Sequence, residues 1–274
     1  MSGRSLRAGG KLAALWLGAF IMIFPIWWIF STSLETSQRA YSFPGVLWPQ
    51  WILTNYARAW SMAPWGRFFL NSVFISGTTT ALALLTALVA GFSFAYYRFR
   101  GRNALFLVVL GSMLVPFEAL LIPNYLIVKQ LGWVNTFTAQ IVPFAASGFG
   151  IFLLRQFILS LPRDLRDAAR VDGASDWHFL WRIVVPNIRP ALATVGIYLF
   201  LLSWNAFLWP LVVTNSPQVQ PLQVGLANFL MTANGTDWTV VSAAAAFTTL
   251  PVLVLFVIAQ RQIVEAISRT GLKG

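Results

Sequence analysis

The sequence predicts an all-α membrane protein that crosses the bilayer six times and keeps both termini in the cytoplasm. Of its 274 residues, 58% are hydrophobic and 10% are charged, whereas a soluble domain has about 25% charged residues. The apolar residues gather in long runs, and a helix needs about 20 of them to cross a bilayer. Lysine and arginine are unequally divided between the segments that join these runs. The six predicted spans are residues 12–31, 68–90, 104–128, 138–157, 191–213 and 240–259.

The first span follows Arg4, Arg7 and Lys11, as the apolar core of a secretory signal also follows basic residues. Its apolar run is longer than the roughly 7–15 residues of a signal core, and no A-x-A-like cleavage site follows Phe30. We therefore expect a retained membrane anchor behind a cytoplasmic N-terminus, residues 1–11.

Two later spans carry polar residues that a purely lipid-facing helix does not need. The third contains Glu118, the only carboxylate within any predicted span, between Pro116 and Pro123. A charge inside the membrane marks a functional site by default, so Glu118 is a candidate for the wall of a solute path. The alternative is that it satisfies backbone groups of a helix broken at the prolines. The fifth span adds Trp204 and Asn205 as further path candidates.

The positive residues set the predicted orientation, because lysine and arginine are retained on the cytoplasmic side. Fifteen of the 19 lie in segments that face the cytoplasm if the N-terminus does. The four in outer segments are Arg39, Arg58, Arg67 and Lys129. The sequence thus predicts a six-span domain, residues 12–259, and a cytoplasmic tail, residues 260–274.

A cytoplasmic loop, residues 155–190, predicts two short helices between the fourth and fifth spans. Ser160 is placed to cap the first, and Gly173 allows the chain to turn after it. Ser175 is placed to cap the second, which Pro186 is expected to end. The loop either rests on lipid headgroups with its arginines or fits a groove of another protein, since tryptophan and arginine are common interface anchors.

The residue types and motifs that the sequence lacks, together with the distribution of its charge, argue against several functions. It has no cysteine, and His178 is its single histidine, so we expect neither thiolate chemistry nor a histidine-rich metal site. It has no G-x-x-x-x-G-K-[ST] motif, so we expect ATP and its magnesium to bind elsewhere. The net charge of +11 lies at the ends of apolar segments rather than on one face, which argues against nucleic acid as a partner.

The loop resembles the EAA loop of permease subunits in ATP-binding-cassette importers. The residues that carry this resemblance are Asp167, Ala168, Ala169, Asp172, Gly173, Ala174, Phe179 and Pro186. In that family the loop is the coupling helix, which seats in a cleft of the cytoplasmic ATPase. One departure is Asp167, because the family usually has glutamate there.

The resemblance extends over nearly the whole chain and narrows the family. The matching segments include Asn55-Tyr56, Asn71-Ser72, Ile122-Pro123, Ser203-Trp204-Asn205, Trp209-Pro210-Leu211, Gln260-Arg261 and Lys273-Gly274. Together they are similar to the inner, six-span subunit of the maltose transporter family. The resemblance implies the type I importer fold and a tail in which Gln260, Arg261, Lys273 and Gly274 contact the ATPase. The family tends to have glycine where Ala266 stands, a second departure.

The resemblance implies a function in sugar import across a bacterial or archaeal plasma membrane. This chain would be a non-enzymatic permease subunit without a cofactor of its own. Its partners would be a second permease subunit, two copies of an ATP-binding subunit, an extracytoplasmic solute-binding protein and the lipid bilayer. An importer of glycerol-3-phosphate or another polyol derivative is the alternative, and the lack of arginine near the centre of any span favours neutral sugars.

Two unrelated functions are weaker interpretations of the same residues. A membrane-embedded glycosyltransferase would need clustered carboxylates at the membrane face, but the loop aspartates belong to the helix-turn pattern. A homomeric channel would need no coupling loop. Co-purification of an ATPase with the chain separates the importer from the channel.

Overall fold

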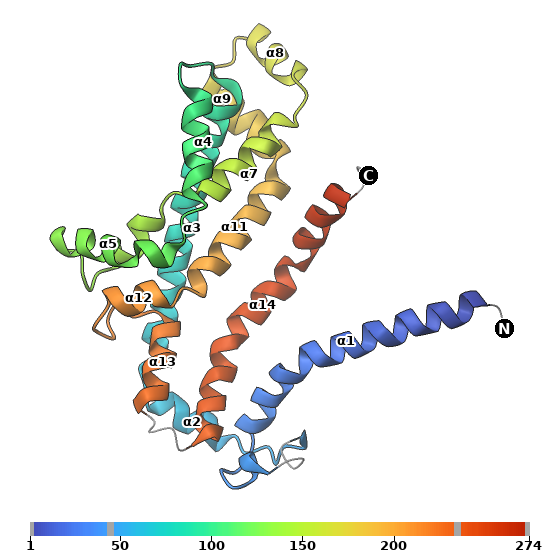
Figure 1. Cartoon of the computed structure of the whole chain (residues 1–274), viewed down its shortest axis with the longest axis vertical. Coiled ribbons are helices and arrows are strands. Elements are labelled where there is room, and N and C mark those ends of the chain that lie inside the picture. The colour runs from blue at the N-terminus through green and yellow to red at the C-terminus, as the bar shows by residue number, and fades with distance from the viewer. Residues whose placement is uncertain (1–2, 43–46, 233–236, 272–274) are drawn as a thin grey trace. The chain divides into compact units, whose positions relative to one another are not determined.

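The computed structural model describes residues 3–42, 47–232 and 237–271, and within them the chain forms helices and no β-strand. Its contacts divide it into two compact units, Met1–Trp65 with Gly225–Leu253 and Gly66–Val224 with Val254–Gly274. The expected all-helical fold is confirmed. The helices (Figure 1), including two 3₁₀ helices and the π-helical η4, are α1 (Gly3–Ser33), η1 (Arg39–Tyr41), α2 (Thr54–Ser61), α3 (Trp65–Tyr96), α4 (Arg102–Ser112), α5 (Phe117–Gln130), α6 (Phe137–Ile141), η3 (Val142–Phe144), α7 (Gly148–Leu159), α8 (Asp164–Val171), α9 (Asp176–Phe179), η4 (Leu180–Val184), α10 (Val185–Asn187), α11 (Arg189–Trp204), α12 (Leu208–Val213), α13 (Leu222–Thr232) and α14 (Trp238–Gly271).

Two helical stretches are long and apolar enough to cross a membrane, Lys11–Ser33 within α1 and the whole of α3. Three further candidates are bent pairs of helices, which turn by 99° between α4 and α5, by 41° before α7 and by 81° before α11. If each pair is one span, the described residues contain up to five. The expected six-span topology stays a prediction.

The largest bend comes directly before Glu118. Pro116 has an extended backbone, with φ −60° and ψ 132°, at the position that precedes α5. Proline lacks an N–H group and its ring clashes with the preceding turn, so it separates helices readily. Pro123 lies inside α5 instead. Of the two prolines that flank Glu118, Pro116 therefore marks the break.

The core of the second unit packs α3 closely against α7. Leu154 and Ile158 of α7 are fully buried in a cluster that includes Ala87 of α3. Gly91 makes the close approach possible, because a Cβ atom there would lie 3.1 Å from the backbone nitrogen of Arg155. This packing holds α3 and α7 together over the stretch that leads to the loop.

In the first unit, Trp65 forms an aromatic cluster with its edge-to-face neighbours Phe229, at 5.3 Å between ring centroids, and Phe247, at 4.9 Å. The side chain of Asn55 donates a hydrogen bond of 2.8 Å to the backbone oxygen of Glu35, which fixes the segment after α1 to α2. The carboxylate of Glu35 is fully buried. The sequence did not point to it, because it lies just beyond an apolar run.

Candidate functional site

The first helix of the predicted loop, α8, ends in a Schellman turn. Gly173 has a backbone φ of +72°, an angle that residues with a side chain rarely adopt. Its N–H donates to the oxygen of Arg170 at 3.0 Å, and the N–H of Ala174 donates to the oxygen of Ala169 at 2.9 Å. These two bonds satisfy carbonyl groups that the helix end leaves free. The turn predicted at Gly173 is confirmed.

The second helix begins where it was predicted. The Oγ atom of Ser175 accepts a hydrogen bond from the N–H of His178 at 3.2 Å, as expected for a helix cap. The helical path then continues through the π segment η4 and through α10, which contains Pro186 and ends at Asn187. The prediction that Pro186 ends this helix is therefore wrong. Local π geometry changes the hydrogen-bond ladder and thereby accommodates a proline.

The predicted cap at Ser160 is also wrong. Its Oγ donates to the oxygen of Phe157 at 2.7 Å, at the end of α7. Arg163 precedes the first residue of α8, Asp164, and makes no side-chain cap. A serine between two helices fits the end of the earlier helix as well as the start of the later one, and the sequence did not distinguish them.

The eight residues that carry the EAA resemblance divide into exposed and buried groups. Asp167, Ala168, Asp172 and Gly173 are exposed, Ala174 and Pro186 are partly buried, and Ala169 and Phe179 are buried. Ala169 is 5% exposed and Phe179 is 2% exposed. These two therefore attach the loop to its own subunit, and the first four are available to a partner.

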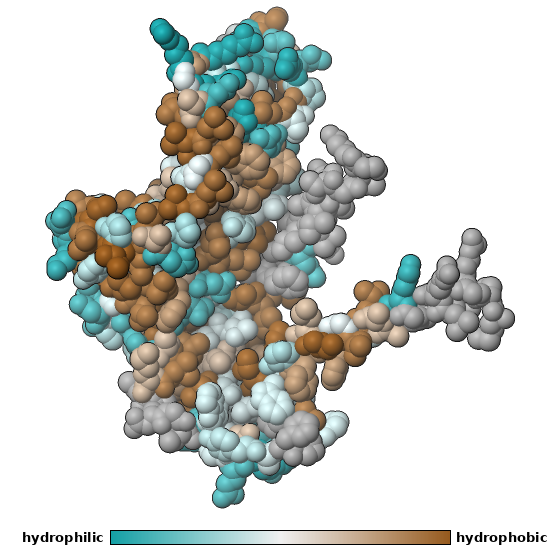
Figure 2. Space-filling view, in the orientation of Figure 1, coloured by the Kyte–Doolittle hydropathy of each residue, from teal (hydrophilic) through white to brown (hydrophobic). Residues whose placement is uncertain are grey.

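Three apolar side chains on the loop surface add to that exposed group. Val171 is 88% exposed, Trp177 is 62% exposed and Trp181 is 38% exposed. Figure 2 shows that the surface over α8 and α9 is otherwise mostly hydrophilic. The sequence analysis did not identify Val171. An apolar residue between Arg170 and Asp172, in an otherwise polar helix, could have indicated a contact surface there.

The second unit also contains a cavity of about 530 Å³. One face of α3 contributes Ser72, Ser76 and Thr79, which are three or four residues apart and therefore on the same side of the helix. Gln140 of α6 and Ser203 of α11 also line it. The cavity thus gathers polar groups from several helices.

Several polar atoms at this cavity are buried without a hydrogen-bond partner. They include Ser76 Oγ, Thr79 Oγ1 and Gln140 Oε1. The Nε2 group of Gln140 donates to the oxygen of Val219 at 2.9 Å, and this bond leaves the amide oxygen as the free acceptor. A buried polar atom without a partner is unfavourable by about 1–3 kcal/mol. The residues that carry these atoms line the cavity, so a side-chain rotation would present the atoms to a ligand with hydroxyl groups.

An aromatic cluster forms another wall of the cavity. Phe117, Phe144 and Trp209 contact one another, with ring centroids 5.5 to 6.3 Å apart. The indole N–H of Trp209 donates to the oxygen of Ala139 at 2.9 Å and so is satisfied within the protein. The rings therefore offer apolar faces beside the polar groups of α3 and α6.

Of the three predicted path residues, the structure places one at the cavity. Glu118, in the first turn of α5, is among the lining residues. Trp204 is buried with its ring stacked on Phe200, and Asn205 donates to the oxygen of Leu201 at 2.9 Å. Neither is among the lining residues. Gln140, in the fourth predicted span, was missed because the sequence argument sought path residues only in the third and fifth spans.

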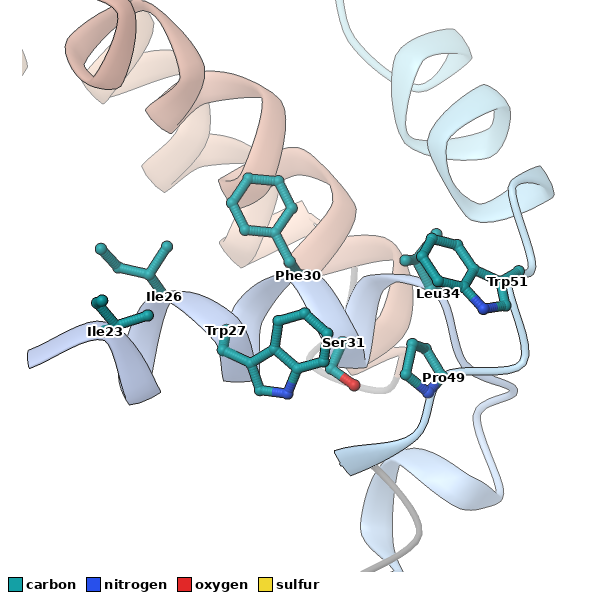
Figure 3. Close-up of a pocket in the computed structure, with 8 residues that line it drawn as sticks. All are labelled: Ile23, Ile26, Trp27, Phe30, Ser31, Leu34, Pro49 and Trp51. Carbon is teal, nitrogen blue, oxygen red and sulfur yellow. The ribbon is translucent and has the colours of Figure 1, made fainter. Parts of the chain in front are cut away.

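A second pocket, of about 340 Å³, lies in the first unit (Figure 3). Most of its walls are apolar, from Trp27 and Phe30 of α1 to Trp51 in the following segment. Ser31 is its only polar lining residue among those described. These walls suit a hydrocarbon chain better than a polar solute.

The predicted tail contacts lie mostly outside the described residues. Gln260 is described, and its Nε2 group donates to the oxygen of Val257 at 2.9 Å within α14. The side chain of Arg261 is outside the described part, as are the whole of Lys273 and Gly274.

Comparison with known proteins identifies the family. Residues 83–269 match the family of binding-protein-dependent transport system inner membrane components. The arabinooligosaccharides transport system permease protein AraQ of Halalkalibacterium halodurans is 39% identical over 76% of this chain and 74% of its own length. The lactose transport system permease protein LacG of Rhizobium radiobacter is 35% identical over 93% of both chains.

A solved structure agrees with this match over almost the full length. A chain from a bacterial ABC transporter involved in the import of the acidic polysaccharide alginate superposes with a TM-score of 0.83, at 26% identity, over 95% of this chain and 98% of that one. The predicted resemblance to importer permeases is confirmed: this chain belongs to the family of binding-protein-dependent transport system inner membrane components and is a transport permease subunit.

Proposed function

We propose that this chain is one of two different permease subunits of an ATP-driven importer of neutral sugars, from mono- to oligosaccharides. The cavity in the second unit is the observation that carries the substrate class. Its unpaired hydroxyl and amide atoms match sugar hydroxyl groups, and its aromatic wall matches the apolar face of a sugar ring. The relatives named for arabinooligosaccharide and lactose transport support the same class.

The charge of the cavity favours a neutral sugar over glycerol-3-phosphate. Glu118 is the only charged residue among the described residues that line it, and no lysine or arginine does. A carboxylate repels a phosphate group, and the repulsion is stronger where water is partly excluded. An importer of phosphorylated polyols would place a cation there.

The exposed part of the loop is proposed to dock on a cytoplasmic ATPase. Asp167, Ala168, Asp172 and Gly173 would lie in the contact, with Val171 and Trp177 as its apolar centre. The full assembly would contain two ATPase copies, the second permease subunit and an outer solute-binding protein, in the inner membrane of a bacterium. The family description supports the dependence on a binding protein.

Six spans with both termini in the cytoplasm complete the proposal. The bends before α5 and α7 would then lie within the third and fourth spans, and the bend before α11 would lie where the cytoplasmic loop meets the fifth span. Glu118 would line the solute path. Trp204 and Asn205 would lie near the path, because they directly follow the lining residue Ser203 in the sequence.

A matched pair of amide deletions tests the cavity. Gln140→Leu removes a buried acceptor at the cavity, and Gln130→Leu removes an exposed amide at the end of α5. In proteoliposomes that contain the whole importer, we expect Gln140→Leu to raise the KM for the sugar about tenfold, the effect of one lost hydrogen bond. Gln130→Leu should leave the KM unchanged. An unchanged KM in both variants would remove the cavity from the solute path.

Co-purification tests the assembly independently. The tagged chain, expressed with its neighbouring genes, should retain an ATPase whose activity rises when the loaded binding protein is added. A chain that purifies without an ATPase and still conducts solute would instead support a channel.

Glu118→Gln separates the two interpretations of that carboxylate. Lost uptake at normal membrane abundance supports a place in the solute path. Lost abundance supports a structural role at the helix break, and the two measurements are made on the same membranes.

A further inference from the structure

The loop is joined to α3 by Arg166, a residue to which neither the sequence motif nor the family match gives a role. Arg166 lies in the first turn of α8 and its Nη1 group donates a hydrogen bond of 3.0 Å to the backbone oxygen of Tyr96. Its guanidinium carbon lies 4.6 Å from the centre of the Tyr96 ring. Tyr96 is the last residue of α3, so the arginine binds a carbonyl group at the negative end of a helix.

The second loop helix reaches the same residue. Phe179 of α9 packs edge-to-face against the Tyr96 ring at 5.4 Å, and it lies 6.2 Å from the ring of Phe92, one turn earlier in α3. Figure 1 shows α8 and α9 at the end of the second unit where the chain turns from α3 towards α4. Two helices separated by the Gly173 turn therefore converge on one tyrosine.

From Tyr96, α3 runs without a break to the cavity. Thr79 and Ser76 line the cavity from this helix, 17 and 20 residues before Tyr96, and α3 contains no proline. At 1.5 Å per residue the separation is about 25–30 Å. The other routes from the loop to the cavity are interrupted, by the non-helical residues 160–163 before α8 and by the 81° bend before α11.

The contact that Arg166 makes has an unfavourable part as well as a favourable one. Its Nε atom is buried and has no hydrogen-bond partner. An unpaired buried donor is unfavourable by about 1–3 kcal/mol, comparable to the gain from the bond that the same side chain makes to Tyr96. Arg163, just before α8, and Arg170, within α8, are exposed instead.

We propose that Arg166 is a positioning residue that makes α3 follow the loop, so that a displacement of the loop reaches Ser76 and Thr79 in the cavity. This inference rests on the proposed docking of the loop on an ATPase. The helix α3 then acts as a rigid connection, with the Arg166–Tyr96 contact as its attachment at the loop end. Without that contact, the loop moves and the cavity does not respond.

The test compares Arg166→Gln with Arg98→Gln in the complete importer, reconstituted with its binding protein and sugar. Basal ATP hydrolysis, hydrolysis stimulated by the loaded binding protein, and sugar uptake are measured on the same samples. For Arg166→Gln we expect unchanged basal hydrolysis and about tenfold less sugar taken up per ATP, from the loss of one hydrogen bond to a charged group. Arg98→Gln, at an exposed arginine two residues after α3 and outside the loop, should behave as the natural chain.

Two further variants keep the test decisive if Arg166→Gln fails to assemble. Arg166→Lys retains the charge but not the planar group, and should give intermediate uptake per ATP. Tyr96→Leu removes the ring that Arg166 and Phe179 share, and should reproduce the loss, whereas Tyr96→Phe should not. Normal uptake per ATP in Arg166→Gln, or in both Arg166→Lys and Tyr96→Leu, would overturn the inference.

Failure of the proposed function has a different signature. If the natural chain shows no ATP hydrolysis that depends on the binding protein, the docking proposal itself is wrong before any variant is compared. If the natural chain is coupled and all Arg166 and Tyr96 variants are equally coupled, only the role of Arg166 is lost.

Discussion

Asp237 and Arg58 form an ion pair of 3.0 Å between their Oδ2 and Nη2 atoms, within the first unit. The other carboxylate oxygen accepts hydrogen bonds from the hydroxyl groups of Ser37, at 3.1 Å, and Thr239, at 2.6 Å. Three separate segments of the chain are thus held by one carboxylate just before α14.

These contacts predict an acid-sensitive stability. Burial alone would raise the pKa of Asp237, but the hydrogen bonds from Thr239 and Ser37 and the charge of Arg58 outweigh it and lower the pKa. A carboxyl group whose pKa is lower in the folded state stabilises the fold above its unfolded pKa of about 3.9, and the effect is lost as the pH falls through the folded pKa. We expect the melting temperature in detergent to fall more steeply below about pH 4 for the natural chain than for Asp237→Asn. Asp172→Asn, at an exposed aspartate, serves as the control, and equal slopes in all three proteins would contradict the prediction.

The contact of α3 with α7 predicts a difference between two glycines on the same helix. A Cβ atom at Gly91 would lie 3.1 Å from the backbone nitrogen of Arg155 and 3.3 Å from the oxygen of Ile151, whereas Gly77 has nothing within 4 Å. Gly91→Ala should therefore destabilise the protein by about 1–3 kcal/mol, because backbone atoms must shift. Gly77→Ala should be neutral or stabilising. Thermal unfolding of both variants is the measurement, and equal melting temperatures would show that α7 can move aside.

The turn after α8 predicts a strain effect without a steric one. A Cβ atom at Gly173 would meet nothing within 4 Å, but its φ of +72° is unfavourable for other residues by about 1–2 kcal/mol. We expect Gly173→Ala to increase amide hydrogen exchange in residues 164–174. Gly173→Asn should be milder, since asparagine tolerates this conformation. Gly111→Ala, at an open position within α4, should leave exchange in the loop unchanged.

The proposed topology predicts labelling from opposite faces. The natural chain has no cysteine, so single cysteines can be introduced at the exposed positions Arg170 and Gln218. In intact cells an impermeant maleimide should label Gln218→Cys and should reach Arg170→Cys only after the membrane is opened. Labelling of both positions in intact cells would exclude a cytoplasmic loop.

The sequence predicted local features of the loop best. The turn at Gly173 and the cap at Ser175 depend on residues within five positions of each other, and a short pattern contains all the information they need. Ser160 failed because the same serine suits either of two adjacent helix ends. Pro186 failed because a proline is compatible with a π segment, and nothing nearby in the sequence announces that geometry.

The cavity was the harder part to predict. Hydrophobic runs report how long an apolar stretch is and not where it bends, so the break at Pro116 and the uninterrupted Pro123 looked alike. Ser76, Thr79 and Gln140 meet only because α3 and α6 come together across more than 60 residues of chain. Serine and threonine are common in apolar helices, and the lack of partners at all three residues becomes visible only in three dimensions.

Val171 and Trp177 leave the loop with apolar surface exposed to water, and this has a consequence for how cells handle the subunit. Exposed apolar patches mark interaction sites and aggregation liabilities, and cells remove defective chains through chaperones and proteases. A copy synthesised in excess would therefore be short-lived, and the cellular ratio of subunits would be set by degradation as well as by synthesis.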